Sequence, residues 1–316
     1  MRRLCLCVLL LAGCGDDAVD LGDAGDAGDA ASEVSVDAAD AAPEIGEPDE
    51  GGPPSTDHCN YAPLPPTARA GGVVESGLLE AGAAEVFLSV PVGIALGAYS
   101  ARAEIAGNQG RVDERPTSGF FAASTGIETR LQAKAIALRA GGETVLIVKA
   151  DLGLGADDLL YNLEERLGPE FAGKVLLAVS HSHAAVAQYS HNSTLALGLG
   201  LRDPLSYGRL IDDLEIACRD AIGALEPATV ALGYNPDFDL ENLISSDRRI
   251  ENDGLAGGAE KDHHLYALRI DRPDGSPIAM AFVFGVHPTV LGPDNDLTST
   301  EVTGAIERRL EERFAD

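Results

Sequence analysis

Histidines at the ends of two apolar segments are the residues of this sequence best suited to metal chemistry. Residues 174–180 predict a buried strand, which runs into His181-Ser182-His183. Alternate side chains of a strand share a face, so we expect the two imidazoles to point the same way. A second apolar run, 278–286, ends in His287-Pro288, and the proline, which has no N–H, is expected to stop that strand. Neutral imidazole binds transition metals, so the pattern favours a metal site at the edge of a sheet.

The same histidines also fit a purely structural interpretation. Histidine is often partly buried without binding anything, and a His-x-His pair occurs by chance in many sequences. The third histidine, His287, strengthens the metal hypothesis, but spacing alone leaves both interpretations open.

The predicted secondary structure that would position these histidines alternates between strands and helices over much of the chain. This alternation predicts an α/β (α+β mixed) fold with a layered mixed β-sheet and flanking helices in a single domain. The strand-only stretch after Thr229 predicts an antiparallel portion, and Ser206 is the expected N-cap of the second helix. Strands are predicted at 84–88, 131–138, 144–150, 174–180, 229–234, 264–270 and 277–286, and helices at 157–167 and 207–225.

The first residues have the pattern of a bacterial lipoprotein leader. A basic start precedes an apolar segment too short to span a membrane, and Leu11-Ala12-Gly13-Cys14 matches a lipobox. We therefore expect residues 1–13 to be a signal peptide and Cys14 to carry the lipid that tethers the protein to a membrane. Gly15 after the cysteine favours the outer membrane of a bacterial cell envelope. The alternatives are an ordinary signal peptide with a coincidental cysteine and a short apolar core helix.

A long acidic stretch follows the lipobox. Residues 15–57 hold fourteen Asp and Glu residues and no Lys or Arg, so residues 14–70 are interpreted as a lipidated cysteine with a disordered linker. The net charge of −28 argues against nucleic acid as a partner, because phosphate would be repelled. Cys59 and Cys218 could pair in an oxidising compartment, or Cys218 could be a small core residue.

The motifs together resemble the N-terminal domain of the neutral (non-lysosomal) ceramidase family. These enzymes are zinc-dependent amidases that cleave the N-acyl bond of ceramide. Their H-T-H-S-G-P-G segment resembles His181-Ser182-His183, and their V-H-G-T or V-H-P-T segment resembles Val286-His287-Pro288-Thr289. Weaker similarities follow the family's order at residues 90–99, 133–138, 145–152, 247–249 and 299–304.

The resemblance implies a role for each site residue. His181 and His287 would bind Zn²⁺, and His183 would lie beside the metal to hold substrate or a proton. Arg248, where the family has an N-R pair, would orient the scissile amide or a substrate hydroxyl. From the sequence alone, Arg248 fits equally well in a surface salt bridge. The remaining histidines belong to no motif and are interpreted as surface residues: His58, His191, His263 and His264.

The sequence also departs from the family pattern. Ala184-Ala185-Val186 replaces S-G-P, Asp247 replaces the Asn of N-R, and Glu301 replaces the Asp of S-x-D. Ser299 and Glu301 are interpreted as structural. Family members continue with a strand, a G-D-x-S-P-N segment bearing the catalytic serine, and a Glu and a Tyr that complete the zinc site. We therefore expect residues 71–316 to be a ceramidase-like N-terminal domain that is incomplete at its C-terminus.

Two functions remain open at this point. The first is a zinc-dependent amidohydrolase of ceramidase type, acting on ceramide-like lipids but inactive as this chain alone. The second is a non-catalytic surface lipoprotein that is derived from the same fold and binds metal or lipid.

Overall fold

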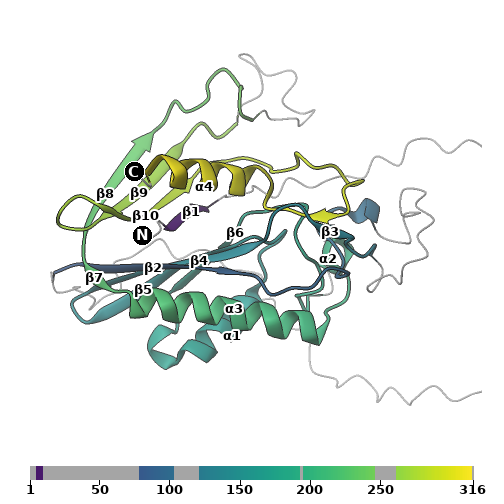
Figure 1. Cartoon of the computed structure of the whole chain (residues 1–316), viewed down its shortest axis with the longest axis horizontal. Helices are drawn as coiled ribbons and strands as arrows, with labels where there is room; N and C mark the ends of the chain where they lie inside the picture. Colours follow the sequence, from purple (N-terminus) through teal and green to yellow (C-terminus); the bar gives the residue numbers. More distant parts are fainter. Residues whose placement is uncertain (1–4, 10–77, 103–120, 193–194, 246–260, 315–316) are drawn as a thin grey trace, which may run out of the picture. The chain divides into compact units, whose positions relative to one another are not determined.

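The structure, a computed structural model, describes residues 5–9, 78–102, 121–192, 195–245 and 261–314. These residues fall in one unit with a five-stranded sheet, a four-stranded sheet and a two-stranded pairing (Figure 1). The predicted fold class is confirmed: the sheets are mixed and helices flank them. The sequence predicted one layered sheet, and the structure divides the strands between two.

The five-stranded sheet has the order β6-β5-β4-β2-β7. Strands β5 and β6 run parallel, and the other neighbours are antiparallel. Gly141 and Gly142 join β4 to β5, and both have positive φ, as a two-residue turn that matches the twist of the strands requires. The strands are β2 (Glu80–Phe87), β4 (Gln132–Ala140), β5 (Glu143–Ala150), β6 (Val175–Val179) and β7 (Glu226–Pro227).

Helices α1 (Asp157–Leu167) and α3 (Pro204–Gly223) cover one face of this sheet (Figure 1). Each buries a stripe of residues three or four apart, which is the pattern that predicted both helices. Helix α3 crosses close over β2 at Gly82, where a Cβ would lie 2.2 Å from the carbonyl oxygen of Ala221. A short helix, α2 (Ala196–Leu199), precedes α3.

The start of α3 corrects one prediction. The N-cap is Asp203, not Ser206, and Pro204 occupies the first turn. The Asp203 carboxylate accepts hydrogen bonds from the backbone N–H of Ser206 at 2.8 Å and from its hydroxyl at 2.5 Å. Hydrogen bonds from Ser206 hold the pKa of Asp203 below its ordinary value. A carboxylate three residues before the free amide is the usual capping arrangement, and Ser206 acts as its donor.

The four-stranded sheet has the order β1-β10-β9-β8. The pairs β8–β9 and β9–β10 are antiparallel, which confirms the arrangement predicted after Thr229. Apolar residues such as Ile270 and Ala279 pack with Ile136 and Ala81 of the five-stranded sheet. The strands are β1 (Cys5–Leu9), β8 (Thr229–Asn235), β9 (Leu265–Asp271) and β10 (Pro277–Val283).

Strand β1 comes from the segment predicted to be a leader. Its backbone pairs in parallel with β10, from Cys5 opposite Ala279 to Leu9 opposite Val283. The alternative of a short apolar helix at this place is wrong, because these residues form a strand. Cleavage before Cys14 stays a prediction.

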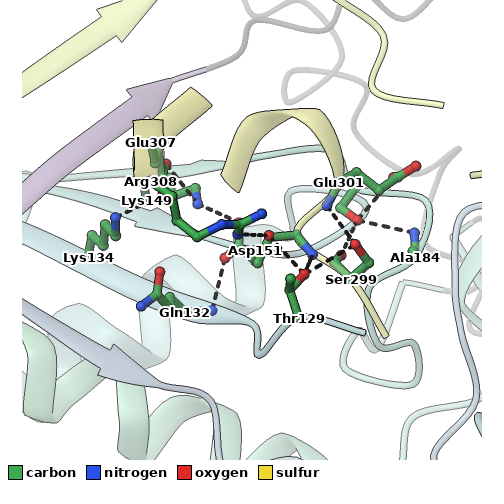
Figure 2. Close-up of polar contacts among 12 residues, drawn as sticks. Thr129, Gln132, Lys134, Lys149, Asp151, Ala184, Ser299, Glu301, Glu307 and Arg308 are labelled. Atoms are coloured by element: carbon green, nitrogen blue, oxygen red, sulfur yellow. Dashed lines mark hydrogen bonds and ion pairs between the residues drawn. The ribbon is translucent and has the colours of Figure 1, made fainter. Parts of the chain in front are cut away.

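Helix α4 (Glu301–Phe314) is joined to the five-stranded sheet by a buried ionic cluster (Figure 2). Lys149 contacts Asp151 and lies 2.9 Å from Glu307, which in turn lies 2.9 Å from Lys134. Burial alone would lower the pKa of Lys149, but Asp151 and Glu307 raise it above its ordinary value. Burial would raise the pKa of Glu307, but the two lysines hold it below its ordinary value. Glu311 adds a further contact to Lys134 at 2.5 Å.

A short parallel pairing leads into α4. Strand β11 (Leu297–Thr298) lies beside β3 (Gly126–Ile127), two residues before the helix begins. This pairing fixes the direction in which the chain enters α4.

Several predicted features lie outside the described residues: Cys14, the acidic segment, Cys59 and Arg248. Cys218 is buried in α3, where burial raises the pKa of its thiol to about 12. Within the described part of the chain, no helix is long and apolar enough to cross a membrane.

Candidate metal centre

The loop after β6 carries the first two histidines. Strand β6 ends at Val179, and Ser180 continues its direction by donating to the carbonyl oxygen of Ala150 at 3.0 Å. His181 then adopts a left-handed backbone conformation with φ 55°. The two histidines come together because the chain turns at His181, and not because of strand alternation as the sequence suggested. A non-glycine residue in this region is uncommon and is often found at functional sites.

The third histidine, His287, follows β10 of the four-stranded sheet. His287 lies four residues beyond the end of β10, since that strand stops at Val283 and not at the predicted residue 286. Its Nε2 is 2.9 Å from Nε2 of His183, which is 3.2 Å from Nε2 of His181. One nitrogen of each ring lies within 4.8 Å of the others. The structure therefore brings together all three histidines singled out by the sequence.

A backbone carbonyl fixes the tautomer of His181. Its Nδ1 contacts the carbonyl oxygen of Gly153, and a carbonyl can only accept, so Nδ1 carries the proton. The Nε2 lone pair of the neutral ring is then directed at the other two histidines. The next residue, Leu154, is held by Tyr189, whose hydroxyl donates to its carbonyl oxygen at 2.6 Å and accepts from its N–H at 2.8 Å.

The three rings differ in their access to solvent. His183 is 4% exposed, His181 is half-buried and His287 is exposed. Tyr99 closes the buried side, with its ring edge-on to His183 at a centroid distance of 4.4 Å. Its hydroxyl donates to the carbonyl oxygen of Leu291 at 3.1 Å. The cluster is therefore walled on one side and open on the other.

The donor set fits a transition metal. A tetrahedral ion with metal–nitrogen bonds of about 2.0–2.1 Å places its nitrogen ligands about 3.3 Å apart. Nε2 of His183 lies 3.2 Å and 2.9 Å from its two neighbours, and one nitrogen of each ring lies within 4.8 Å of the others. An ion held by His181 and His287 would therefore lie beside Nε2 of His183. In the metal-free protein the same contacts are hydrogen bonds, in which Nε2 of His181 accepts and the tautomers of His183 and His287 set the donors. Catalytic zinc sites keep a coordination position for water or substrate, and the exposure of His287 agrees with such a position.

Two buried charged residues that the sequence did not single out as site residues support the histidine loops. Glu301 was interpreted as structural, and Arg102 carried no motif. Burial raises the pKa of Glu301 above its ordinary value, although N–H donors of Leu291 and His183 oppose the shift. The similarity at residues 299–304 gave Glu301 a position in a motif but not its role, whereas Arg102 belongs to no motif and acts on a loop 81 positions away.

The other histidines with described positions lie outside this cluster. His191 contacts Arg202, and His264 contacts Asp262 at 2.6 Å; both histidines are exposed. Ser299 is buried, donates to Glu128 at 2.7 Å and accepts from the N–H of Glu301, which agrees with a structural role.

The solved structures that are similar to this chain include two ceramidases. A ceramidase complexed with C2 matches with a TM-score of 0.55 and 19% sequence identity, over 71% of this chain and 34% of its own. Neutral ceramidase from Pseudomonas aeruginosa matches with the same TM-score and identity, over 72% of this chain and 34% of its own. The chain has a ceramidase-like fold. It spans about a third of the length of these ceramidases.

The likeness to ceramidases rests on the fold alone. No protein-family model matches the sequence, and no curated protein matches it. The resemblance drawn from His181-Ser182-His183 and residues 286–289 is thus confirmed at the level of the fold. In this ceramidase-like fold the histidine cluster lies where the loops after β6 and β10 meet.

Proposed function

We propose that this chain carries the metal centre of an amidohydrolase of ceramidase type, which acts on the N-acyl bond of ceramide-like lipids. The observation that carries the proposal is the convergence of His181, His183 and His287 from two loops, with one side open. The ceramidase-like fold supports the substrate class.

The proposed metal is Zn²⁺, held by His181 and His287. When bound, zinc would supply a Lewis acid that polarises the amide carbonyl or lowers the pKa of a bound nucleophile. His181 offers Nε2 because Gly153 holds its Nδ1 proton. His287 is the exposed member of the cluster.

His183 is proposed to hold substrate or a proton beside the metal. Its Nε2 lies between those of the other two histidines, and Tyr99 packs edge-on against its ring. Arg248 is proposed to orient the scissile amide or a substrate hydroxyl. These roles rest on the motif resemblance and on the position of the histidines.

The test is release of fatty acid from a fluorescent short-chain ceramide, with zinc and with a chelator. Turnover that needs zinc and is lost in His183→Ala would support the amidohydrolase. Because little or no release is expected from this chain alone, the assay is repeated with the chain joined to the C-terminal part of a neutral ceramidase. Binding of zinc and ceramide without release in both cases would support the non-catalytic lipoprotein. A chain that binds neither zinc nor ceramide would contradict both.

We also propose that the protein is tethered to the bacterial envelope through lipid on Cys14, with residues 14–70 as a spacer. The lipobox and the one-sided charge of the spacer support this arrangement. A tether of this kind would keep the site near lipid substrates.

A further inference from the structure

One carboxylate joins the two loops that carry the histidines. Oε2 of Glu301 accepts a hydrogen bond from the backbone N–H of His183 at 2.7 Å, and Oε1 accepts from the N–H of Leu291 at 2.9 Å. The N–H of Ala184 also points at this carboxylate (Figure 2). The Ser182 hydroxyl lies 3.1 Å from Oε2. Glu301 is 7% exposed, so these contacts are shielded from water.

The backbone of Glu301 is strained in order to place this side chain. Its φ is 46°, a left-handed conformation in which glycine would be the undemanding choice. Such a conformation persists only where the surroundings determine it. Hydrogen bonds of Ser299 hold this conformation. The Ser299 hydroxyl accepts from the backbone N–H of Glu301 at 2.9 Å, and the backbone N–H of Ser299 donates to the carbonyl oxygen of Ala184 at 2.9 Å.

A buried cation holds the same two loops from the other direction. Nη1 of Arg102 contacts the carbonyl oxygen of His183. Nε and Nη2 of Arg102 donate to the carbonyl oxygens of Pro293 at 3.2 Å and Asn295 at 3.1 Å. The N–H of His183 is therefore fixed by a carboxylate and its C=O by a guanidinium, and both charges also hold the segment that follows His287.

We propose that Glu301 is a positioning residue of the metal centre, which holds the loop of His183 and the loop of His287 at the separation that brings their Nε2 atoms together. This inference rests on the proposed metal centre. Glu301 acts through the backbone, because its carboxylate contacts N–H groups and a hydroxyl and not an imidazole. Groups that orient metal ligands change metal affinity by about 10–100-fold when they are removed.

The variant that tests the inference is Glu301→Gln. One oxygen of the carboxylate becomes an NH₂ group, which cannot accept, so a loop amide loses its partner while the side-chain volume is unchanged. The matched control is Glu311→Gln on the same helix, which weakens an ion pair with Lys134 of β4 instead of a contact to a histidine loop.

Each protein is titrated with Co²⁺, whose visible absorption reports coordination geometry, and Zn²⁺ affinity is measured by competition. We expect Glu301→Gln to lose about 10–100-fold in affinity and to change the Co²⁺ spectrum, while Glu311→Gln keeps both. Thermal melts of the metal-free proteins separate affinity from folding. Should Glu301→Gln not fold, Ser182→Ala removes one hydroxyl from the same network and should weaken binding several-fold.

The outcomes separate the two claims. Equal affinities and spectra for wild type and Glu301→Gln, or for wild type and Ser182→Ala, would overturn the positioning role and leave the metal centre standing. Equal losses in Glu301→Gln and Glu311→Gln would also overturn it, since the effect would then be general destabilisation. A wild-type protein that binds no metal would overturn both claims.

Discussion

Two kinds of partner position the histidines of the cluster: a backbone carbonyl for His181, and shared buried charges for the loops of His183 and His287. Gly153 orients the ring of His181, the buried charges of Glu301 and Arg102 hold the backbone of His183, and His287 belongs to a loop tied to Glu301 through Leu291. These contacts go to the backbone or to Nδ1 of His181, so removing the imidazole of one histidine should leave the other two rings in place, which makes single substitutions informative.

We expect His181→Ala and His287→Ala to lower zinc affinity by more than about 100-fold, which exceeds the usual effect of losing an orienting group. The reason is that each substitution removes a nitrogen donor from the cluster. Calorimetry with zinc measures the affinities, and His264→Ala is the control, because His264 is exposed and paired with Asp262. Equal binding by wild type and both variants would refute the ligand assignment.

The sequence predicted which histidines meet but not how they meet. The motifs identified His181, His183 and His287, whereas the turn at His181 depends on a left-handed backbone that no local pattern announces. The support from Glu301 spans 118 positions, and that from Arg102 spans 81. Buried charges of this kind are chosen by tertiary contacts, so spacing carries no signal for them.

The helices and strands were likewise predicted well where their limits depend on nearby residues, and poorly where they depend on residues far along the chain. Helix α1 has the limits predicted for it because its apolar stripe lies within one short segment. Strand β10 ends at Val283, three residues before the predicted end, because the apolar run continues into a loop that packs Phe284 and Val286 against the core. The division of strands into two sheets depends on pairing between distant segments, which single-segment patterns do not contain.

The cap of α3 gives a prediction at this scale. Asp203→Ala should destabilise the protein by about 1 kcal/mol, the usual effect of losing an N-cap, because Asp203 accepts two hydrogen bonds from Ser206. Urea unfolding at neutral pH measures the change. Ser206→Ala is the control and should cost less, since its backbone N–H remains a donor.

The same cap predicts a dependence on pH. The folded state lowers the pKa of Asp203, so its contribution is present above the unfolded value of about 3.9 and is lost as pH falls through the lower folded value. The stability difference between wild type and Asp203→Ala should therefore shrink below about pH 4. A difference that stays constant into acid would show that the carboxylate is not the capping group.

The ionic cluster beneath α4 gives a larger expected effect. Lys149→Met should destabilise the protein by about 3–5 kcal/mol, because Asp151 and Glu307 would lose a cation at a site shielded from solvent. The control is Lys174→Met, which removes a partly exposed ion pair with Glu143 worth about 1 kcal/mol or less. Similar losses for the two variants in urea unfolding would show that the buried cluster does not hold α4.

At the scale of the whole molecule, the acidic segment should be dispensable for folding. Residues 15–57 have one sign of charge and no apolar periodicity, so they cannot bury enough surface to offset the entropy of ordering. We expect the proteins with and without this segment to melt at the same temperature within a few degrees. A larger loss on deletion would show that the segment packs on the folded part.

The first residues of the chain cannot be both a cleaved leader and a strand of the mature protein. As a leader, residues 1–13 would be removed before Cys14, and the mature protein would lack β1. As β1, Cys5–Leu9 would pair with β10 and protect its amides on one edge. The chain cannot do both, because a cleaved segment contributes no strand to the mature fold.

We expect the leader to prevail, because the basic start, short apolar segment and lipobox cysteine occur together. Mass spectrometry of the protein purified from membranes should find Cys14 at the N-terminus with a diacylglyceryl group, and Cys14→Ser should leave the membrane fraction. Hydrogen exchange of the β10 amides then shows whether β1 is paired with this strand. With residues 1–13 removed, the β10 amides on the side of β1 should exchange faster than those hydrogen-bonded to β9. A mature chain that keeps residues 1–13, with both sets of amides protected, would make β1 part of the fold and refute the lipid anchor.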